Sequence, residues 1–444
     1  MSKTKPQTGA HVEQATWVTH GPMLGAVSDR SARIWLRTDR ECTVRVLVAH
    51  SQTLNGATYS TPLLLEEAHD YTGVLLLPDL TPNSTYYYAL ELDGAVVTAG
   101  DTGAAVWSLR TAPPPATGDQ FKVVFGSCAK AEWNGNGNGW SVWNAIAAQE
   151  PALIISMGDN PYLEDLDTLV KTGKYTPQEL PGYIRQRYQV NRTVPEFRQL
   201  SARVPVYAAW DDNDYGRNDG DGASNPYKNI ALQVFKEYWA NPSYAPGGRA
   251  GTWTTFTYGG VQFFLLDDEF YADPQKQKTE PKSFLGGEQL AWLKEELLRS
   301  NAAFKVLVTG SPWNPWSYRP DAWYNYPAEF KELCTFLRDN AISGAFALSG
   351  DVHRTEAYRF STGVPGLYDL AEFVSSPLKN APKEYYDKDP GHTRQALWHY
   401  TEGPSFGVLE FDTRKENPTV TFRPYKDTGE PLEFSLTLTL DDLT

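Results

Sequence analysis

The stretch RVPVYAAWDDNDYGRNDGDG, residues 203–222, joins an apolar strand pattern to an acidic loop. Its first half is apolar enough for a buried strand. Its second half, WDDNDYGRNDGDG (210–222), holds five aspartates, two asparagines and one arginine. Charges of one sign repel one another at this spacing, so either water solvates the loop or a cation binds in it. Counted from Asp211, an EF-hand would need a bidentate glutamate where Gly222 stands, so any metal ion must be shared with other loops.

Outward from this stretch, apolar strand patterns alternate with helical patterns through most of the chain. The predicted strands cover residues 121–128, 151–159, 203–212, 261–269, 304–312 and 344–353. The predicted helices cover residues 140–150, 183–201, 229–240, 286–300 and 327–339. Three more strands are expected at 405–412, 419–425 and 433–440. This alternation predicts a layered α/β domain over residues 119–444, with the last strands at its carboxyl end.

The amino-terminal part has a different rhythm. From about residue 17 to 112 the strand patterns, among them ARIWLRT (32–38) and TYYYALELDG (85–94), follow one another with turn residues between them. Short strands at this spacing predict a small β-sandwich of the immunoglobulin or fibronectin type III kind. TAPPPATG (111–118) is typical of a linker. We therefore place the sandwich domain at 12–112 and the α/β domain at 119–444.

Composition and charge narrow the function. The 444 residues carry a net charge of −14 without a basic cluster, which argues against nucleic acid and anionic membrane surfaces as partners. The three cysteines, Cys42, Cys128 and Cys334, have neither zinc-site nor disulfide-framework spacing. No apolar run is long enough to span a bilayer, and the first thirty residues lack the apolar core of a signal peptide. A soluble protein is expected. Its compartment is open, because the mature form of an exported (periplasmic or secreted) protein would look the same.

Five predicted strands share one feature, a polar ending. The endings are Ser127-Cys128, Gly158-Asp159-Asn160, Asp211-Asp212, Asp267-Asp268 and Gly350-Asp351-Val352-His353. Loops at the carboxyl ends of strands in layered α/β folds converge on one crevice, which is where ligands bind. Tyr162 follows the second ending closely. Together these strand ends would deliver Cys, Asp, Asn, Tyr and His side chains to one place.

Such a set of side chains can hold metal ions. Carboxylate oxygens favour calcium, magnesium or manganese, whereas a thiolate with a phenolate favours a more polarising metal such as iron. Each residue also has a plain interpretation. Cys128 could be a buried small hydrophobe and Asp159 a helix cap. Tyr162 could be packing and His353 a hydrogen-bonded core histidine. Asp267 and Asp268 are equally well explained as capping or solvated carboxylates.

Several motifs in combination resemble one known family. They are FGSC (125–128), GDNPY (158–162), WDDNDYGRND (210–219), LGGEQLAWLKEEL (285–297), TGSPW (309–313) and LSGDVHR (348–354). These residues are similar to the PhoD-type alkaline phosphatase/phosphodiesterase family, which belongs to the calcineurin-like metallophosphoesterase superfamily. The resemblance spans most of the chain, since the preceding sandwich also fits the family's amino-terminal domain. It implies a four-layer α/β/β/α domain with metals at the strand ends.

The resemblance also implies a metal-ligand set. A histidine-poor centre would hold ferric iron with calcium nearby, other divalent metals being possible. Matched by motif, the residues on the iron side are Cys128, Asp159, Tyr162, Asp351 and His353. Asp211, Asp212 and Asn218 match the acidic loop, at which other metal contacts are made. The strand-end argument points to a similar set of residues but does not choose iron.

The implied activity is hydrolysis of phosphate esters, either monoesters or diesters, with a small-molecule substrate. Metals would bind the phosphate oxygens, activate a water or hydroxide for in-line attack and stabilise the charge of the transition state. Cations, rather than lysines, would then let an acidic protein accept an anionic substrate.

Two positions depart from the family pattern. The acidic loop usually contains Trp-Asp-Asp-His, and Asn213 stands at the histidine position. Asparagine can donate a hydrogen bond but cannot protonate a leaving group. Many relatives also carry arginine soon after the fourth strand, where LLDDEFYAD (265–273) has Glu269 and Ala272. The candidate catalytic residues are Asn213, Arg217 and Arg354, with Arg319 as a further phosphate contact.

These departures leave three interpretations. The chain is a phosphohydrolase with a shifted substrate preference, for instance for a diester with a good leaving group. Alternatively it hydrolyses a different ester, or it is an inactive metal-binding scaffold whose sandwich and aromatic surface bind a partner. The aromatic segment 379–403 either overhangs the cleft or is a plain surface loop.

Overall fold

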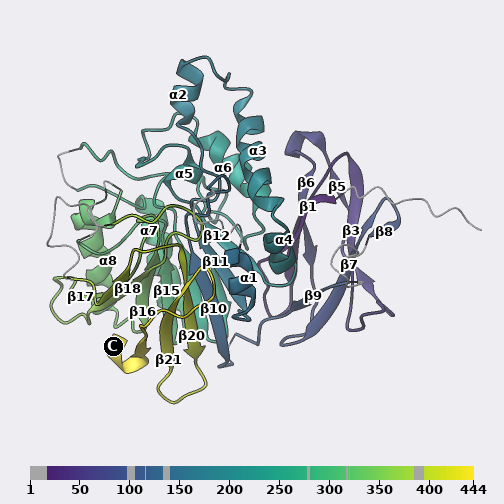
Figure 1. Ribbon diagram of the computed structural model, residues 1–444. Helices are drawn as coiled ribbons and strands as arrows, with labels where there is room; N and C mark the ends of the chain where they lie inside the picture. The colour runs from purple at the N-terminus through teal and green to yellow at the C-terminus, as the bar shows by residue number, and fades with distance from the viewer. Residues whose placement is uncertain are drawn as a thin grey trace, which may run out of the picture.

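The chain forms mixed α/β layers with a smaller group of strands beside them. A computed structural model describes residues 18–97, 106–115, 117–133, 141–277, 281–316, 319, 321–384 and 395–444 (Figure 1). Residues 385–394 of the predicted cleft segment, and the first residues of the predicted sandwich, lie outside this described part. None of the described helices is both long enough and apolar enough to cross a bilayer.

The amino-terminal strands form two sheets. The smaller sheet has the order β1-β2-β6, and the larger one the order β4-β3-β7-β8, with β5 on β3 and β9 on β7. The strands are β1 Val18–Gly25, β2 Ala32–Thr38, β3 Cys42–Ala49, β4 Thr58–Tyr59, β5 Leu63–Leu65, β6 Thr72–Leu77, β7 Thr85–Leu92, β8 Ala95–Val97 and β9 Trp107–Arg110. Ile34 and Leu75 of one sheet share a buried core with Val46 and Leu90 of the other. The immunoglobulin or fibronectin likeness of this part stays a prediction.

Two larger sheets form the centre of the α/β part. The first has the order β12-β11-β10-β20-β21-β22, and the second the order β13-β14-β15-β16-β18-β17-β19. The strands of the first are β10 Gln120–Gly126, β11 Leu153–Met157, β12 Val206–Ala209, β20 Ser405–Asp412, β21 Thr419–Lys426 and β22 Leu436–Thr439. Those of the second are β13 Thr254–Tyr258, β14 Val261–Leu265, β15 Phe304–Val308, β16 Ala345–Ser349, β17 Thr355–Phe360, β18 Leu370–Val374 and β19 Trp398–Tyr400. Strands β10 to β12 run parallel, as do β14 to β16, so their carboxyl ends lie at common edges.

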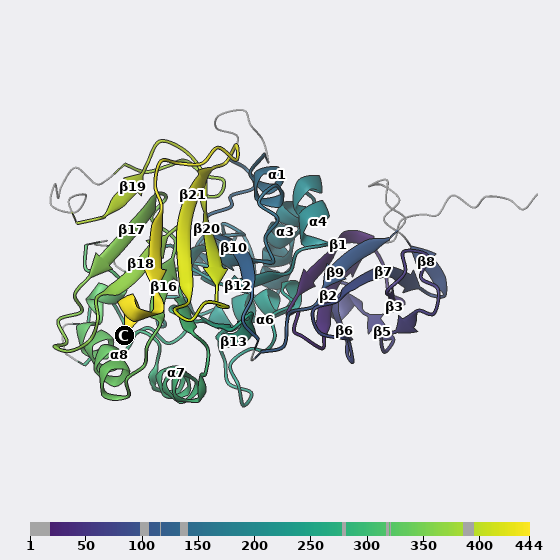
Figure 2. The ribbon, with the colours of Figure 1, turned by 90° about the horizontal axis from the view of Figure 1, so that it is seen from below.

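Helices cover the outer faces of both sheets. They are α1 Ser141–Ala147, α2 Leu166–Lys171, α3 Leu180–Arg192, α4 Pro195–Ser201, α5 Asp212–Tyr215, α6 Lys228–Tyr238, α7 Gly287–Arg299 and α8 Pro327–Asp339, with 3-10 turns at Glu67–His69, Trp323–Asn325 and Leu440–Leu443. Helices α7 and α8 lie on one side of the stacked sheets, and α1, α3 and α4 on the other (Figure 2). The expected mixed α/β fold with several sheets is confirmed.

Side-chain alternation in the strands produces this layering. In β10, Val123 faces the core between the two sheets together with Phe263 and Phe346, because successive strand residues point to opposite faces. Its neighbour Val124 packs in the other direction, against a cluster that contains Ile184 of α3. A third cluster joins the second sheet to α7 and α8. The parallel strands β11, β12 and β14 to β16 are therefore buried on both faces.

One predicted helix is wrong in detail. Residues 183–201 were expected as a single helix, whereas the chain forms α3, ending at Arg192, and α4, beginning at Pro195. Proline forces the preceding residue out of the helical region, and Val194 has the extended angles φ −64° and ψ 116°. The break turns α4 toward β1 of the amino-terminal sheet.

The amino-terminal strands pack directly against the helices of the α/β part. Trp35 of β2 donates from Nε1 to the carbonyl of Glu237 at 2.8 Å, and Tyr88 donates to the carbonyl of Ala202 at 2.7 Å. Trp35 also packs in the same buried cluster as α3 and α6. The amino-terminal sheets thus pack against the helices that cover the first large sheet, whose strands carry several site residues.

Candidate metal centre

The predicted ligands come from strand ends in both large sheets. Cys128 follows β10, Asp159 follows β11 and Asp211 follows β12, all in the first sheet. Asp351 and His353 follow β16 in the second sheet. Because these parallel strands end on the same side of the stacked sheets, the structure brings their terminal side chains together. Asp212 begins the short helix α5 directly after Asp211.

Four of these residues have an uncommon backbone conformation. Cys128, Asp159, Asp351 and His353 have φ values of 61°, 57°, 61° and 56°. The left-handed region is disfavoured for side chains other than Gly, Asn and Asp, and such strain concentrates at functional sites. The four positive φ values all lie at or directly beside the candidate donor side chains.

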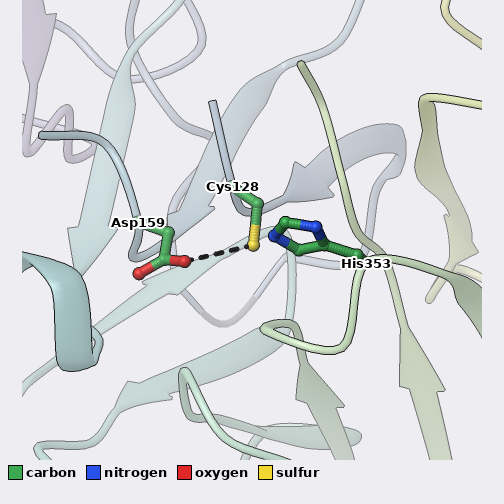
Figure 3. Close-up of side chains that lie close together, drawn as sticks. All are labelled: Cys128, Asp159 and His353. Carbon is green, nitrogen blue, oxygen red and sulfur yellow. Dashed lines mark hydrogen bonds between the residues drawn. The ribbon is translucent and has the colours of Figure 1, made fainter. Parts of the chain in front are cut away.

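Cys128, Asp159 and His353 form the first donor group (Figure 3). One donor atom from each residue lies within 4.8 Å of the others, and all three residues are buried. The thiol of Cys128 lies 3.4 Å from Oδ2 of Asp159 and 3.1 Å from Oγ of Ser376. Burial raises the pKa of this thiol well above its usual value. A cation bound between these atoms would favour the thiolate, which is the form that binds metals.

His353 is oriented with one ring nitrogen free to act as a ligand. Nδ1 lies 2.7 Å from the carbonyl oxygen of Ala381, a contact in which the nitrogen must be the donor. The neutral ring then carries a lone pair on Nε2, which lies 3.3 Å from Oη of Tyr162. Burial, followed by the charge of Lys383, lowers the pKa of His353 to about 4. This neutral tautomer, fixed by a backbone carbonyl, is the usual state of a metal-binding histidine.

Asp159, Asp211, Asp212 and Asp351 form the second donor group. Their carboxylate oxygens lie within 4.8 Å of one another, and all four residues are buried. Both oxygens of Asp211 accept no hydrogen bond from the described residues. Burial, followed by the charge of Asp212, raises the pKa of Asp211 well above its ordinary value. Buried carboxyl groups are stable as anions only beside a compensating cation, so this donor set, when ionised, fits hard metal ions.

Two predicted ligands remain, Tyr162 and Asn218. Tyr162 is partly buried, and burial followed by the charge of Asp159 raises the pKa of its phenol well above 10. Its contact with Nε2 of His353 places the phenol oxygen beside the first donor group. Asn218 is exposed, next to Asp219 in the loop that follows α5.

Asn213 contacts the carboxylates directly. Its side-chain Nδ2 donates to Oδ1 of Asp212 at 2.9 Å and to Oδ2 of Asp159 at 3.2 Å. Both amide hydrogens are therefore directed to the second donor group. In this arrangement Asn213 orients two carboxylates.

The three candidate arginines have different positions. Arg217 is substantially exposed and pairs with Asp165 at 3.0 Å, on the outside of the loop. Arg354 is buried and pairs with Glu356 at 2.9 Å. Arg319 reaches the donor groups, with Nε 2.6 Å from Oδ2 of Asp351. Of these three, Arg319 has its guanidinium in direct contact with a donor carboxylate.

Asp214 is a buried residue of the site that sequence reasoning does not single out. Its Oδ2 accepts from the backbone N–H of Asp159 at 2.5 Å and from that of Asp211 at 3.3 Å. Its Oδ1 accepts from Tyr188 of α3 at 3.1 Å. Asp214 thus ties two strand ends to the helix layer. Its position three residues after Asp211, as in a capping box, is the signal that could have identified it.

A third acidic group adjoins the second and shares Asp212 with it. Oxygen atoms of Asp212, Asp219 and Asp321 lie within 4.8 Å of one another. Asp321 does not follow a predicted strand, so the strand-end pattern could not have found it. Arg319 stands between this group and Asp351.

Stacked α/β sheets with carboxylate, thiol and imidazole donors at their strand ends define a protein of the metallophosphoesterase class. A family model described as PhoD-like phosphatase matches residues 123–422, about two thirds of the sequence. The chain therefore belongs to the PhoD-like phosphatase family, and the resemblance stated from its motifs is confirmed. A second model, described as a domain of unknown function (DUF7800), matches residues 15–107.

Two solved structures share the fold. A structure of PhoD has a TM-score of 0.70 at 18% identity, covering 98% of this chain and 94% of that one. A purple acid phosphatase from yellow lupin (Lupinus luteus) has a TM-score of 0.67 at 13% identity, covering 95% and 74%. Two uncharacterized proteins of Mycobacterium tuberculosis are each 23% identical over 272 residues, which is 60% of this chain. The match spans 45% of the length of those relatives.

Proposed function

We propose that the protein is a metal-dependent hydrolase of phosphate esters. The observation that carries this proposal is the buried group of Asp159, Asp211, Asp212 and Asp351, which adjoins Cys128 and His353 at the carboxyl ends of the strands. Membership of the PhoD-like phosphatase family supports it. An inactive metal-binding scaffold would keep the same buried carboxylates, so the family membership is what makes the hydrolase the favoured interpretation.

Two kinds of metal ion fit the donors. Ferric iron suits Cys128, Asp159, Tyr162, Asp351 and His353, because thiolate, phenolate and imidazole are ligands of a polarising metal. Calcium or another hard divalent cation suits the oxygens of Asp159, Asp211 and Asp212, with Asn218 as a further ligand from the acidic loop. When bound, such ions supply positive charge for the phosphate oxygens and acidity for the attacking water.

The residues of the chain position the donors and the substrate. Asp214 holds the strand ends that carry Asp159 and Asp211, and Asn213 orients the carboxylates of Asp159 and Asp212. Arg319 is the arginine with a guanidinium beside the donors, and we assign it the contact with the substrate phosphate in preference to Arg217 and Arg354. Its fixed planar fork matches two phosphate oxygens.

The substrate we propose is a small phosphate ester with a good leaving group, and an activated diester suits the site best. Asn213 cannot donate a proton to the leaving group near neutral pH. Esters that leave as stable anions, such as aryl phosphates, do not need this proton. We therefore include the alkaline phosphatase/phosphodiesterase subtype in the proposed function.

Kinetics with metal analysis test the proposal. Protein loaded with iron and calcium is expected to hydrolyse p-nitrophenyl phosphate, bis-p-nitrophenyl phosphate or both. Cys128→Ala is expected to lose iron, its associated colour and at least ~100-fold of kcat/KM, because loss of a contact that only supports a metal ligand already costs about 10- to 100-fold. Cys334→Ala is the matched control, because Cys334 is a buried cysteine of α8 and belongs to none of the donor groups found among the described residues.

Two results would count against the proposal. If metal-loaded wild-type protein hydrolyses neither ester, the proposed hydrolase activity is contradicted. Full iron occupancy in Cys128→Ala would remove Cys128 from the ligand set even if the activity is found.

A further inference from the structure

Asp214 receives hydrogen bonds from two strand ends and from one tyrosine of the helix layer. Its Oδ2 accepts from the backbone N–H groups of Asp159 and Asp211, at 2.5 and 3.3 Å. Its Oδ1 accepts from the hydroxyl of Tyr188 at 3.1 Å, and Asp214 is fully buried. Because both oxygens belong to one rigid carboxylate, the tyrosine on Oδ1 fixes where Oδ2 meets the two backbone groups.

Tyr188 is held in turn by aromatic rings between the helices and the amino-terminal sheets. It is a buried residue of α3, and its ring stacks on Tyr238 of α6 with the centroids 5.1 Å apart. The carbon Cζ of Arg192 lies 5.2 Å from the centroid of each of these rings. The centroid of Tyr238 lies 5.5 Å from that of Trp35, which belongs to β2. Rings from both parts of the molecule therefore set the position of the Tyr188 hydroxyl.

One carboxylate of the amino-terminal part fixes the far end of this stack. Asp70 accepts a hydrogen bond from the hydroxyl of Tyr238 and another from Gln189 of α3, the latter at 2.7 Å. It also forms a bidentate pair with Arg37 of β2, in which both bonds are 2.9 Å long. Gln189 donates in addition to the hydroxyl of Tyr238 at 3.1 Å. Asp70 thus joins two side chains of the helix layer to the amino-terminal sheets.

We propose that the amino-terminal sheets help to position the metal ligands, through the path from Asp70 by Tyr238 and Tyr188 to Asp214. Tyr188 is then a positioning residue, because its hydroxyl donates to Asp214 and acts through it on the two strand ends. The proposal rests on the proposed function, since the strand ends carry residues assigned there as metal ligands. The plain alternative is that these contacts only hold the two parts of the molecule together.

Amide hydrogen exchange of metal-free protein tests the end of the path near the ligands. Tyr188→Phe keeps the stacked ring and removes the hydroxyl, so the buried carboxylate behind the strand ends loses one of its donors. In chelator, the peptides that span Asp159 and Asp211 are expected to exchange about 10-fold faster than in wild type. Tyr88→Phe is the matched control, because it removes another buried hydroxyl at the same interface, which donates to the carbonyl of Ala202.

Two results of this exchange measurement would overturn the proposal. The first is exchange of both peptides in Tyr188→Phe at the wild-type rate. The second is an equal acceleration in Tyr88→Phe, because the effect would then be a general loosening of the interface.

Calcium affinity separates positioning from a purely structural role. Calorimetric titration of chelator-treated protein with calcium is expected to show about 10- to 100-fold weaker binding in Tyr188→Phe, as for loss of a group that orients a metal ligand. Binding by Tyr88→Phe should equal that of wild type. Unchanged calcium affinity in Tyr188→Phe, together with a lower melting temperature in chelator, would show that its hydroxyl only stabilises the fold.

A double-mutant cycle tests the amino-terminal end of the path. Asp70→Asn is expected to accelerate exchange of the same two peptides about 2- to 30-fold, the range for residues that act from a distance. In the Tyr188→Phe background it should have no further effect, because the link is already cut. Asp39→Asn is the control, because Asp39 pairs with its sequence neighbour Arg40. Effects of Asp70→Asn and Tyr188→Phe that multiply would overturn the path. Should Asp70→Asn fail to fold, Gln189→Met, which removes one donor to Asp70, must show the same dependence on Tyr188.

The path and the hydrolase fail separately, because exchange in chelator requires neither a bound metal nor a substrate. If the peptides respond as expected and the protein hydrolyses no ester, the path is supported and the hydrolase is contradicted. If the protein hydrolyses esters while the peptides of Tyr188→Phe exchange as in wild type, the hydrolase is supported and the path is contradicted.

Discussion

At the scale of single residues, Asn213 occupies the position at which the family pattern has histidine. Its amide donates to Asp159 and Asp212, so it is an orienting contact of the donor carboxylates. An amide cannot release a proton at neutral pH, whereas an imidazolium can. We therefore predict that this one side chain limits which leaving groups the proposed hydrolase can expel.

Asn213→His is expected to broaden the substrate range toward poor leaving groups. We expect kcat/KM for an alkyl phosphate to rise by about 10- to 100-fold relative to that for the p-nitrophenyl ester, at the lower end of what general acids contribute. Steady-state kinetics on both esters measure the ratio. Asn213→Gln is the control, since it keeps an amide and adds no acid. If the ratio of kcat/KM for the two esters is the same in Asn213→His and Asn213→Gln, residue 213 does not occupy the position of a general acid.

At the scale of elements, the turns after the strands position the ligands, and glycines make these turns possible. Gly158 precedes Asp159, and Gly310 follows β15 at the same edge of the stacked sheets. A Cβ on Gly310 would lie 2.4 Å from Cγ of Asp211, and one on Gly158 would lie 2.3 Å from Cβ of the same residue. Asp211 is thus held between two glycine turns with no room for a side chain.

Gly310→Ala is expected to displace the carboxylate of Asp211. The added methyl would lie 2.4 Å from Oδ1, so the aspartate must move away from the donor group. We expect divalent-metal affinity and kcat/KM to fall by about 10- to 100-fold, as for loss of a contact that supports a metal ligand. Metal titration and kinetics measure both. Gly287→Ala is the control, because a Cβ there meets no atom within 4 Å. Unchanged metal affinity in Gly310→Ala would show that Asp211 is not a ligand.

At the scale of the whole molecule, the amino-terminal sheets and the helix layer share a buried interface. Arg192 of α3 lies among the rings of Trp35, Tyr188, Tyr238 and Trp239, with its carbon Cζ 4.4 to 5.2 Å from their centroids. Burial lowers the pKa of this guanidinium to about 10, so it remains charged near neutral pH. The rings come from both sides of the interface, which explains why the two parts pack as one body (Figure 2).

We expect His20 to make the stability of this interface depend on pH. Burial, followed by the charges of Arg37, Arg192 and Arg198, lowers the pKa of His20 from 6.5 to about 4, and Asp70 opposes this. The unfolded chain therefore binds a proton below pH 6.5 that the folded chain does not bind until about pH 4. The stability that comes from keeping His20 neutral in the folded protein is fully present above pH 6.5 and is lost as the pH falls toward 4. The total loss is on the order of 3 kcal/mol.

His20→Asn is expected to remove this pH dependence. Between pH 6.5 and 4 the free energy of unfolding should fall less steeply in the variant than in wild type. Urea denaturation at several pH values, compared between the two proteins, isolates the effect from carboxylates that titrate in both. His50→Asn serves as the control, because His50 is exposed. Parallel pH profiles for wild type and His20→Asn would contradict the assignment.

Local sequence determined much of this protein. The spacing of apolar residues predicts α8 at Pro327–Asp339 and β20 at Ser405–Asp412 with their observed bounds, because periodicity is a local property. The polar strand endings predict that five strand ends meet, since parallel strands end at one edge. Cys128, Asp159, Asp211, Asp351 and His353 do lie in the donor groups, whereas Asp267 and Asp268 belong to none of those found among the described residues. The motif pattern also predicts the family, which the match over residues 123–422 confirms.

Only the tertiary structure decided the rest. Asp219 and Asp321 join Asp212 through segments whose course no local pattern encodes, so this third acidic group could not be predicted. The sequence does not distinguish Arg217, Arg319 and Arg354 as candidate phosphate contacts. In the structure each forms different ion pairs, and of the three it is Arg319 that contacts a donor carboxylate. The sequence specifies which ionisable side chains are present. Whether each of them is buried, and which groups surround it, depends on how distant segments pack. Burial and neighbours together decide which charges remain uncompensated.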